Sequence, residues 1–495
     1  MREMFQSRLI GAGWEQSAFA LAFAIPNMAR RLFGEGALTA AFVPVFRGEL
    51  EADASLERAR HLARAVLTMA VLMLASVVAL SVIGITGALF WEDLLSDRAR
   101  LTLRLTRLLI PYMLFICAGA FGMGVLNAFG RFAAAAMMPS ILNVFWIAGL
   151  GAVCFFPGLS VTARIEIVCV AILLAGFVQM SFMFRGMAKK GIAPKPVFKG
   201  WSDAPVKLVW RNMAVACIGA GAVQINYLLD QILAQWASPW AAGVIGYADR
   251  LMELPLGIVG TAFGTVLLPT FSAAFAKGDV ASARESFISS TRSMLFVVLP
   301  AATGLVSLSP DITSLIYKGG AFDDAAVIRV ANAVACYSVG LSFFCFMKTI
   351  TPWFHAQKDM KTPLKVAVRM VFANATLNVL SVWLLPVEFR HVGLAASTVV
   401  CSAASCVWLA AIASRRNGPL GMRALVRPVG KMVLSALAMS VVIALARDFL
   451  TARSFAMGPK LAIIIPFGAV VYLAIEAIFD RSSLKMLFRE LRHGR

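Results

Sequence analysis

The feature that most limits what this chain can fold into is a series of long apolar runs separated by short charged clusters. A helix needs about 20 residues to cross the hydrocarbon core of a bilayer. In lipid, a helix satisfies its own backbone hydrogen bonds. The sequence therefore predicts an all-α polytopic membrane protein with spans near residues 16–46, 62–91, 104–128, 132–156, 165–188, 208–237, 240–273, 286–308, 325–354, 364–386, 391–413, 428–447 and 459–479.

Residues 1–10 are too short to cross a bilayer and are interpreted as a truncated first helix, which brings the expected total to about 14 transmembrane helices. The net charge of +20 is explained by the positive-inside rule, so nucleic acid is not an expected partner. Loops after even-numbered helices hold about 29 Lys and Arg, against about 11 in the others. Both termini are therefore predicted to be cytoplasmic.

The run from residue 22 to 46 carries charges inside an otherwise apolar segment. Arg30, Arg31 and Glu35 lie among the helix breakers Pro26, Gly34, Gly36 and Pro44. Charged groups at membrane depth usually face a bundle interior or a water-filled cavity. Pro26 and the glycine pair are expected to interrupt the helix, so we interpret the run as a kinked helix that presents cations to a polar cavity. The alternative is two ordinary helices with a cytoplasmic Arg-Arg between them, although each half is then too short to span.

An internal repeat has a period of about 225 to 235 residues. The segment 127–131 and the later Pro139 are echoed by 355–359 and Pro363, and residues 44–46 are echoed by 269–271. Matching order and offset predict two pseudo-symmetric six-helix lobes, an arrangement that places a transporter's substrate site between the halves. Shared membrane-loop composition is the alternative explanation.

The repeat leads to a division of the chain into four parts. We expect an N-terminal lobe at 1–190, a basic cytoplasmic linker at 191–207, a C-terminal lobe at 208–415, and an extra helix pair with a basic cytoplasmic tail at 416–495.

A second charged membrane segment lies at 247–255. Asp249, Arg250 and Glu253 are spaced i,i+3 and i,i+4, so they project from one helix face. We expect Asp249 to have a structural role, and Arg250 and Glu253 to face the cavity. The cationic groups available to one cavity are then Arg2, Arg30, Arg31 and Arg250. A pyrophosphate is their natural partner, because guanidinium groups bind phosphate oxygens in a bidentate fashion.

Two segments carry a family resemblance. IPNMARRLFGEGALTAAFVPVF at 25–46 and YADRLMELP at 247–255 resemble the MurJ (MviN) lipid II flippases of the multidrug/oligosaccharidyl-lipid/polysaccharide exporter superfamily. The resemblance implies a twelve-helix core plus two C-terminal helices. It also implies alternating-access transport of lipid II, whose pyrophosphate joins an undecaprenyl tail to a sugar-peptide head, across the bacterial cytoplasmic membrane for peptidoglycan biosynthesis.

By the family pattern, Arg2, Arg30 and Arg250 align with substrate-binding arginines, while the roles of Arg31 and Glu35 stay open. Asn27 and Glu253 complete the predicted substrate-binding set, and Arg31 is expected to pair with Glu35. The chain departs from the family at Ser17, where an aspartate is usual, and at Ala24, where a basic residue is frequent. The final helix pair is implied to extend the cavity as a slot for the prenyl tail.

A sodium site is a further expectation. Asp230 is an isolated carboxylate in an apolar run, and the oxygens of Asn374, Asn378 and Thr398 lie on later helices. Sodium is the only cofactor that we expect. Hydrogen bonds between helices are the alternative explanation for these polar residues.

Two competing functions remain at this point. One is an exporter of another polyprenyl-linked saccharide or of drugs, although a cation exporter should show a carboxylate-rich N-terminal lobe. The other is a membrane-embedded polyprenyl-phosphate enzyme, which needs acid-base or metal groups. The four histidines lie at helix ends or in loops, and the sequence has no DxD, HExxH or GxxxxGK[ST] motif. The chain is therefore predicted not to be an enzyme. Its expected partners are lipid II and membrane lipids, and its expected state is a monomer.

Overall fold

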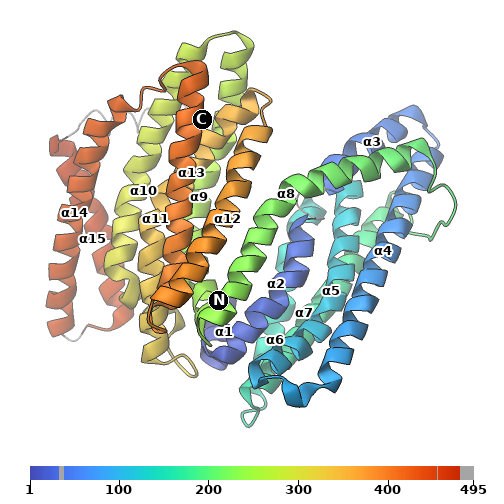
Figure 1. Ribbon diagram of the computed structural model, residues 1–495, viewed down its shortest axis with the longest axis horizontal. Helices are drawn as coiled ribbons and strands as arrows, with labels where there is room; N and C mark the ends of the chain where they lie inside the picture. The colour runs from blue at the N-terminus through green and yellow to red at the C-terminus, as the bar shows by residue number, and fades with distance from the viewer. Residues whose placement is uncertain (33–37, 454, 480–495) are drawn as a thin grey trace. The chain divides into compact units, whose positions relative to one another are not determined.

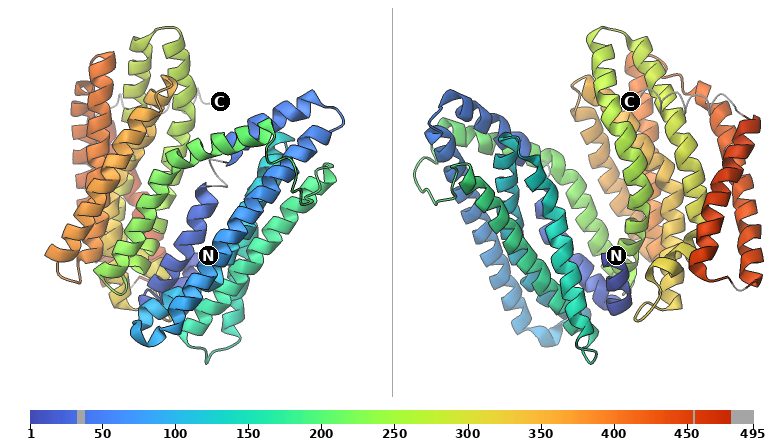
Figure 2. Two further views of the ribbon diagram at one scale, coloured as in Figure 1. Left: turned by 45° about the vertical axis from the view of Figure 1, so that its right-hand side comes forward. Right: turned by 180° about the vertical axis from the view of Figure 1, so that it is seen from behind.

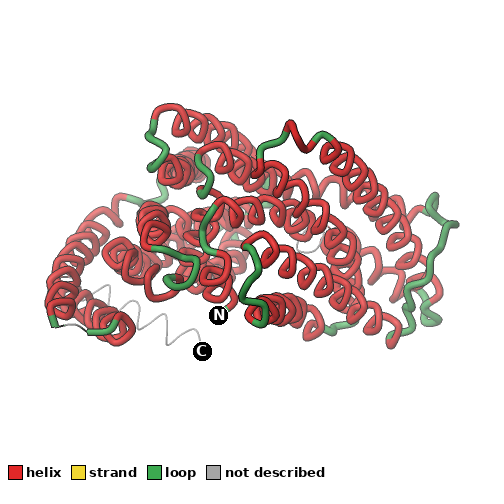
Figure 3. The backbone as a smooth tube through the Cα atoms, turned by 90° about the horizontal axis from the view of Figure 1, so that it is seen from below, coloured by secondary structure: helices red, strands yellow, loops and turns green. Residues whose placement is uncertain are grey.

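The chain folds into long helices joined by short loops. The computed structural model describes residues 1–32, 38–453 and 455–479. In these residues the structure is helix and loop, with one isolated bridge between Gly319 and Phe322 and no strand (Figure 3). Ten of the described helices are long and apolar enough to cross a membrane. The prediction of an all-α polytopic membrane protein is therefore confirmed.

The first compact unit comprises Met1–Gly243 together with Gly319–Phe322. Its α-helices, labelled in Figure 1, are α1 (Arg2–Ile10), α2 (Trp14–Leu32), α3 (Leu38–Ala52), α4 (Glu57–Phe90), α5 (Asp97–Ala128), α6 (Phe132–Cys154), α7 (Val161–Lys189) and α8 (Ala204–Ala237). The short 3-10 helix η2 (Glu92–Leu94) lies between α4 and α5 in the chain. Helix α5 is its centre, since α2, α3, α4, α6 and α7 all pack against it. The buried aromatic rings of Phe19, Tyr112 and Trp146 belong to its core.

The second unit comprises Val244–Lys318 and the chain from Asp323 onward. Its helices are α9 (Ala241–Ala276), which begins three residues before the boundary, α10 (Val280–Tyr317), α11 (Asp324–Ala356), α12 (Lys361–Leu384), α13 (Arg390–Asn417), α14 (Arg423–Ala452) and α15 (Met457–Phe479). Its main core includes Phe271, Phe287 and Trp353. Helices α14 and α15 lie side by side at its edge (Figure 2) and pack against α10.

The apolar runs locate most helix ends to within about five residues, but α5 begins seven residues before its predicted start, and α10 extends six residues before and nine residues beyond its predicted run. The run 16–46 forms two helices, α2 and α3, and residues 33–37 between them lie outside the described range. The expected interruption at Pro26 is wrong, because α2 continues through Pro26 to Leu32. A proline removes only one backbone donor, and a membrane helix tolerates this where neighbouring groups satisfy the freed carbonyl.

The repeated segments form the same turn. After α5, Gly130 has φ +72° and the N–H of Arg131 donates to the carbonyl of Leu126 at 2.9 Å. After α11, Lys358 has φ +60° and the N–H of Asp359 donates to the carbonyl of Phe354 at 3.0 Å. Both helices thus end in a left-handed residue with the same 6→1 bond.

The basic segment between α7 and α8 is held against α4. Arg60 and Arg64 donate from Nε to the carbonyls of Gly191 and Ala193, each at 2.9 Å, and the N–H of Val197 donates to Thr68 Oγ1 at 3.0 Å. Helix α8 then packs on α2, α3 and α4. In the structure, α8 is therefore part of the first compact unit.

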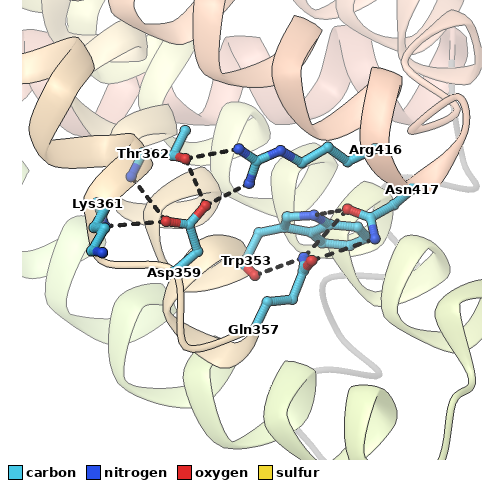
Figure 4. A network of polar contacts seen from close by, with 7 residues as sticks. All are labelled: Trp353, Gln357, Asp359, Lys361, Thr362, Arg416 and Asn417. Carbon is cyan, nitrogen blue, oxygen red and sulfur yellow. Dashed lines mark hydrogen bonds and ion pairs between the residues drawn. The ribbon is translucent and has the colours of Figure 1, made fainter.

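A polar network ties the α11–α12 turn to the end of α13 (Figure 4). Asp359 accepts hydrogen bonds from the N–H of Thr362 at 2.9 Å and from the guanidinium of Arg416. Asn417 Oδ1 accepts from Trp353 Nε1 at 3.2 Å and from Gln357 Nε2 at 3.3 Å. Hydrogen bonds from the Thr362 hydroxyl, the Thr362 N–H and the Arg416 guanidinium lower the pKa of the Asp359 carboxyl from 3.8 to about 2.

Candidate functional site

Arg2 lies in a polar corner between α1 and α6. Its guanidinium stacks on the Trp146 ring, 4.4 Å from the centroid, and Nη1 donates to Asn143 Oδ1 at 3.0 Å. It also forms an ion pair with Glu3. These three contacts fix the orientation of a cation that is only 20% exposed. Glu3 balances part of the positive charge of Arg2. Arg2 therefore interacts with an anion at this corner mainly by donating hydrogen bonds, and less through its net charge.

Two buried glutamines connect this corner to α2. Trp146 Nε1 donates to Gln6 Oε1 at 3.1 Å, and Gln6 Nε2 donates to Gln16 Oε1 at 3.0 Å. A buried series of hydrogen bonds leaves few rotamers to the side chains that form it and so makes their surroundings rigid. These two bonds therefore join α1, α2 and α6 beneath Arg2.

The C-terminal end of α2 presents two further arginines. Arg30 donates from Nε to Asn27 Oδ1 at 3.0 Å, and its positive charge interacts electrostatically with Tyr112 of α5. Arg31 stacks over the ring of Tyr227 on α8, with 5.4 Å from its guanidinium carbon to the ring centroid. Adjacent residues on a helix point about 100° apart. Arg30 accordingly faces α5 and Arg31 faces α8. The expected partner of Arg31, Glu35, lies outside the described residues.

Ser17 occupies the position where the resembled family carries an aspartate. Its side chain is fully buried, and Oγ accepts from the N–H of Gly243 at 3.0 Å. Its carbonyl accepts from Gln235 Nε2 on α8. In this chain the position therefore forms a buried contact between α2 and the chain around Gly243.

Arg250 and Glu253 form an ion pair on α9. Nη1 of Arg250 lies 2.7 Å from Glu253 Oε2, and the two side chains are 41% and 49% exposed. The buried Tyr247 just before them anchors the helix, because its carbonyl accepts from the Tyr317 hydroxyl at 3.2 Å. The pair is therefore held on a fixed helix while its polar atoms stay accessible.

An apolar cavity of 940 Å³ opens beside the same segment of α9. Helices α9, α10, α14 and α15 contribute its lining, which among the described residues contains no charged side chain and includes Leu254, Pro255, Phe296, Pro300, Ile443 and Pro466. Ligand pockets usually measure about 300–1,000 Å³. Leu251 and Leu254 line the cavity, and each directly follows a charged residue, Arg250 or Glu253. About one turn of α9 therefore contains both the ion pair and part of the apolar wall of the cavity.

Buried charges hold α14 and α15 to α10 at one end of this cavity. Lys460 of α15 and Arg447 of α14 both contact the carboxylate of Asp311, at 2.8 Å and 3.1 Å. The neighbours Ile312 and Leu461 line the cavity. The triad therefore fixes the spacing of the helices that form its wall.

The residues of the predicted sodium site lie in both units. On α8, Asn226 Nδ2 donates to Asp230 Oδ2 at 3.2 Å. In the second unit, Asn378 Nδ2 donates to Asn374 Oδ1 at 3.0 Å, and Asn374 Nδ2 lies 3.5 Å from Thr398 Oγ1. Of these contacts, only the one between Asn374 and Thr398 joins two helices, α12 and α13, as the alternative explanation requires; the other two lie within α8 and within α12. Among the described residues, no three His, Cys, Asp or Glu side chains gather at a metal-binding distance.

The predicted site residues fall into two sets. Arg2, Asn27, Arg30 and Arg31 belong to the first unit, while Arg250 and Glu253 belong to the second. The sequence reasoning did not find Trp146, Asn143 or Tyr227 as partners of the arginines. Asn143 and Trp146 are one turn apart in an otherwise apolar helix, which is the only sequence signal that could have indicated them.

Comparison with known proteins gives consistent matches over most of the chain. The family described as "Lipid II flippase MurJ" matches residues 6–465. A probable lipid II flippase MurJ of Rickettsia prowazekii is 32% identical over 408 residues, which cover 81% of this chain and 78% of that protein.

Two solved structures share the fold. One is titled "Lipid II flippase MurJ, inward closed conformation" and has a TM-score of 0.77 at 23% identity, covering 98% of this chain and 96% of that one. The other is an inward-facing multidrug resistance MATE transporter of the MOP superfamily, with a TM-score of 0.69 at 14% identity, covering 84% and 94%.

Proposed function

The chain belongs to the MurJ family of lipid II flippases, and on this premise we propose that it carries lipid II from the cytoplasmic to the periplasmic leaflet of the bacterial cytoplasmic membrane. The observation that carries the proposal is the position of the Arg250–Glu253 pair beside the 940 Å³ apolar cavity. A site of this kind suits a molecule with an anionic head and a long apolar tail.

The head of that molecule is recognised by guanidinium groups. Arg2, Arg30, Arg31 and Arg250 stay charged at any working pH and bind phosphate oxygens in a bidentate fashion. Asn27 and Glu253 orient Arg30 and Arg250 through the bonds at 3.0 Å and 2.7 Å. A pyrophosphate offers enough oxygens to engage several of these groups, whereas a cationic drug is repelled by them.

The tail is accommodated by the cavity between α10 and the α14–α15 pair. Its apolar lining removes prenyl carbons from polar surroundings, and the Lys460–Asp311 pair keeps the two walls in place. Head and tail are thus bound by different parts of the protein, which favours a polyprenyl-linked saccharide over a small drug.

The proposed reaction is transport without a chemical step. Arginine remains protonated and so does not serve as a general acid or base at neutral pH. Two repeat-related halves that alternate in access, with both termini cytoplasmic, account for movement of the head across the membrane. The protein works in this proposal as a monomer and not as an enzyme.

Sodium coupling is a separate part of the proposal. The oxygens of Asp230, Asn374, Asn378 and Thr398 are hard ligands of the kind that alkali cations prefer. The test is the flipping rate in proteoliposomes with a sodium gradient, compared with a choline gradient at equal potential. Loss of the sodium effect in Asn374→Leu supports a site at this residue, and an equal rate in the two gradients removes sodium from the proposal.

The function is tested by complementation of a strain depleted of its lipid II flippase. Arg30→Ala and Arg250→Ala are expected to reach the membrane at normal levels and fail to support growth. Arg185→Ala, on the exposed surface of α7, is the matched control and should complement. If the two site variants complement as well as the parent chain, the arginine-based recognition of pyrophosphate is wrong.

A further inference from the structure

A polar pocket lies in the first unit, separate from the residues discussed above. It has a volume of 400 Å³ and is lined by Arg104, Arg107 and Leu108 of α5 and by Glu166 of α7. Helices α4 and α7 both pack against α5, and Arg104 reaches toward the end of α4, where Nη2 lies 2.8 Å from Glu92 Oε2. The pocket therefore lies between α5 and α7, with Glu92 of η2 paired to Arg104 beside it.

The pocket contains charged side chains of both signs, and only one of them is paired with another side chain of the described residues. Arg104 is balanced by Glu92. Arg107 and Glu166 have no side-chain hydrogen bond or ion pair to any residue in the described part of the chain. The pocket thus offers one guanidinium and one carboxylate to a ligand, with a second guanidinium alongside. Its balance of charge matches a ligand that is itself zwitterionic.

An apolar strip continues from the pocket along α7. Glu166, Val170, Leu174 and Phe177 are spaced i, i+4, i+8 and i+11, so they share one helix face. Val170, Leu174 and Phe177 are 44%, 52% and 51% exposed. Phe177 also contacts Phe115 of α5, with 5.8 Å between ring centroids. The polar pocket is therefore followed along α7 by an exposed apolar strip.

The depth of the pocket fits the edge of a bilayer. Helices α5 and α7 begin at the same end of the unit, and Glu166 and Arg107 lie about 8 Å and 15 Å along their helices at a rise of 1.5 Å per residue. Phe90, Trp91 and Phe155 at that end are 84%, 70% and 83% exposed, as in the aromatic belt of a membrane interface. In the proposed orientation, this end is periplasmic.

From these observations we propose that the pocket binds the headgroup of a zwitterionic aminophospholipid in the periplasmic leaflet. Arg104 and Arg107 hold the phosphate, Glu166 accepts a hydrogen bond from the primary ammonium, and one acyl chain lies along Val170, Leu174 and Phe177. A choline headgroup has no N–H to donate to Glu166, and an anionic headgroup brings its charge toward that carboxylate.

The test is native mass spectrometry of the full chain released from detergent with defined lipids at equal concentration. The unchanged chain should retain dioleoylphosphatidylethanolamine about tenfold better than the phosphatidylcholine or phosphatidylglycerol of the same chains, the value of one charge-assisted hydrogen bond. Arg107→Gln should lose that preference. Glu166→Gln should retain phosphatidylglycerol at least as well as phosphatidylethanolamine. Arg185→Gln, on the same helix, is the control and should behave as the parent chain.

Several outcomes overturn the proposal. Equal retention of the ethanolamine and choline lipids excludes recognition by Glu166, and a preference of the unchanged chain for phosphatidylglycerol assigns the pocket to anionic lipids. Displacement of bound lipid by millimolar glycerophosphoethanolamine assigns it to a soluble headgroup. An unchanged lipid preference in Arg107→Gln places binding elsewhere. Thermal midpoints of all variants, measured in the same detergent, identify any variant that is misfolded. In that case Leu174→Gln is tested in its place, and it should weaken lipid retention without altering the headgroup preference.

Discussion

The ammonium of Lys460 lies 2.8 Å from Oδ1 of Asp311, and both side chains are only 6% exposed. The two residues are 149 positions apart in sequence and join α15 to α10 directly beside the apolar cavity. Arg447 of α14 contacts the other oxygen at 3.1 Å. One carboxylate therefore positions both helices of the C-terminal pair.

Asp311→Asn is expected to destabilise the second unit. Removing the carboxylate leaves the buried Lys460 without a counter-charge, and breaking such a pair costs about 3–5 kcal/mol of unfolding free energy. Thermal denaturation in detergent measures the effect as a lower midpoint. Asp448→Asn, one residue beyond Arg447 and exposed, is the control. Equal midpoints for Asp311→Asn and Asp448→Asn would exclude this role.

Gly304→Leu is expected to reduce transport of a long-tailed substrate selectively. Gly304 lines the apolar cavity, and a Cβ added there has nothing within 4 Å, so the larger side chain takes up volume of the cavity. Displacing two tail methylenes weakens binding about tenfold. Flipping in proteoliposomes should fall for an undecaprenyl substrate and stay constant for a short-tailed analogue. Gly84→Leu on α4, which also meets open space, is the control. Equal loss for both tails would place the tail outside this cavity.

Trp146 is expected to contribute to the first unit in two separable ways. Trp146→Phe removes the Nε1 bond to Gln6 and should cost about 1 kcal/mol of unfolding free energy. Trp146→Ala also removes the ring beneath Arg2 and should cost about 3–5 kcal/mol. Thermal midpoints measure both variants against Trp91→Phe, whose ring is 70% exposed. A Trp146→Phe midpoint as low as that of Trp146→Ala would show that the ring is not the main contribution.

Gly320→Ala is expected to detach the loop after α10 from α1. Gly320 has φ +56°, and a Cβ there lies 2.2 Å from the carbonyl oxygen of Arg8. That contact sits beside the bond from the Ala321 N–H to the same carbonyl at 2.8 Å. Hydrogen exchange at Ala321 should accelerate. Gly130→Ala carries the same backbone strain at φ +72° with nothing within 4 Å and should leave Ala321 protected. Equal exchange in both variants would argue against a steric cause.

Stability is expected to fall below pH 4 through Asp359. The hydrogen bond from the Thr362 hydroxyl, the Thr362 N–H and the Arg416 guanidinium lower the pKa of this carboxyl from 3.8 to about 2. A depressed folded-state pKa gives stability that is complete above the unfolded value and is lost as pH falls toward 2. Thermal midpoints between pH 6 and 2.5 test this, and Asp359→Asn should show a shallower decline. Parallel curves for the two proteins would assign the decline to other carboxylates.

The sequence by itself determined the helices, because hydropathy and backbone hydrogen bonding are local properties. Apolar runs located each of α4 to α15, although the ends of α5 and α10 differ from the prediction by six to nine residues. The spacing of Arg250 and Glu253 on one helix was sufficient to predict that they share a face. The family resemblance followed from the same local segments. It also depended on residues 25–46, of which 33–37 lie outside the described structure.

Only the tertiary structure decided which side chains meet. Arg2 contacts Asn143, 141 positions away, and Arg31 stacks on Tyr227 of another helix. The sequences of these helices contain no pattern that specifies the partner, because apolar faces pack in many registers and a polar group forms hydrogen bonds with any suitable neighbour. Which neighbours are close enough is determined by the packing of whole helices. For this reason the cations were predictable from the sequence, while their partners, the apolar cavity and the pocket at Arg107 and Glu166 were not.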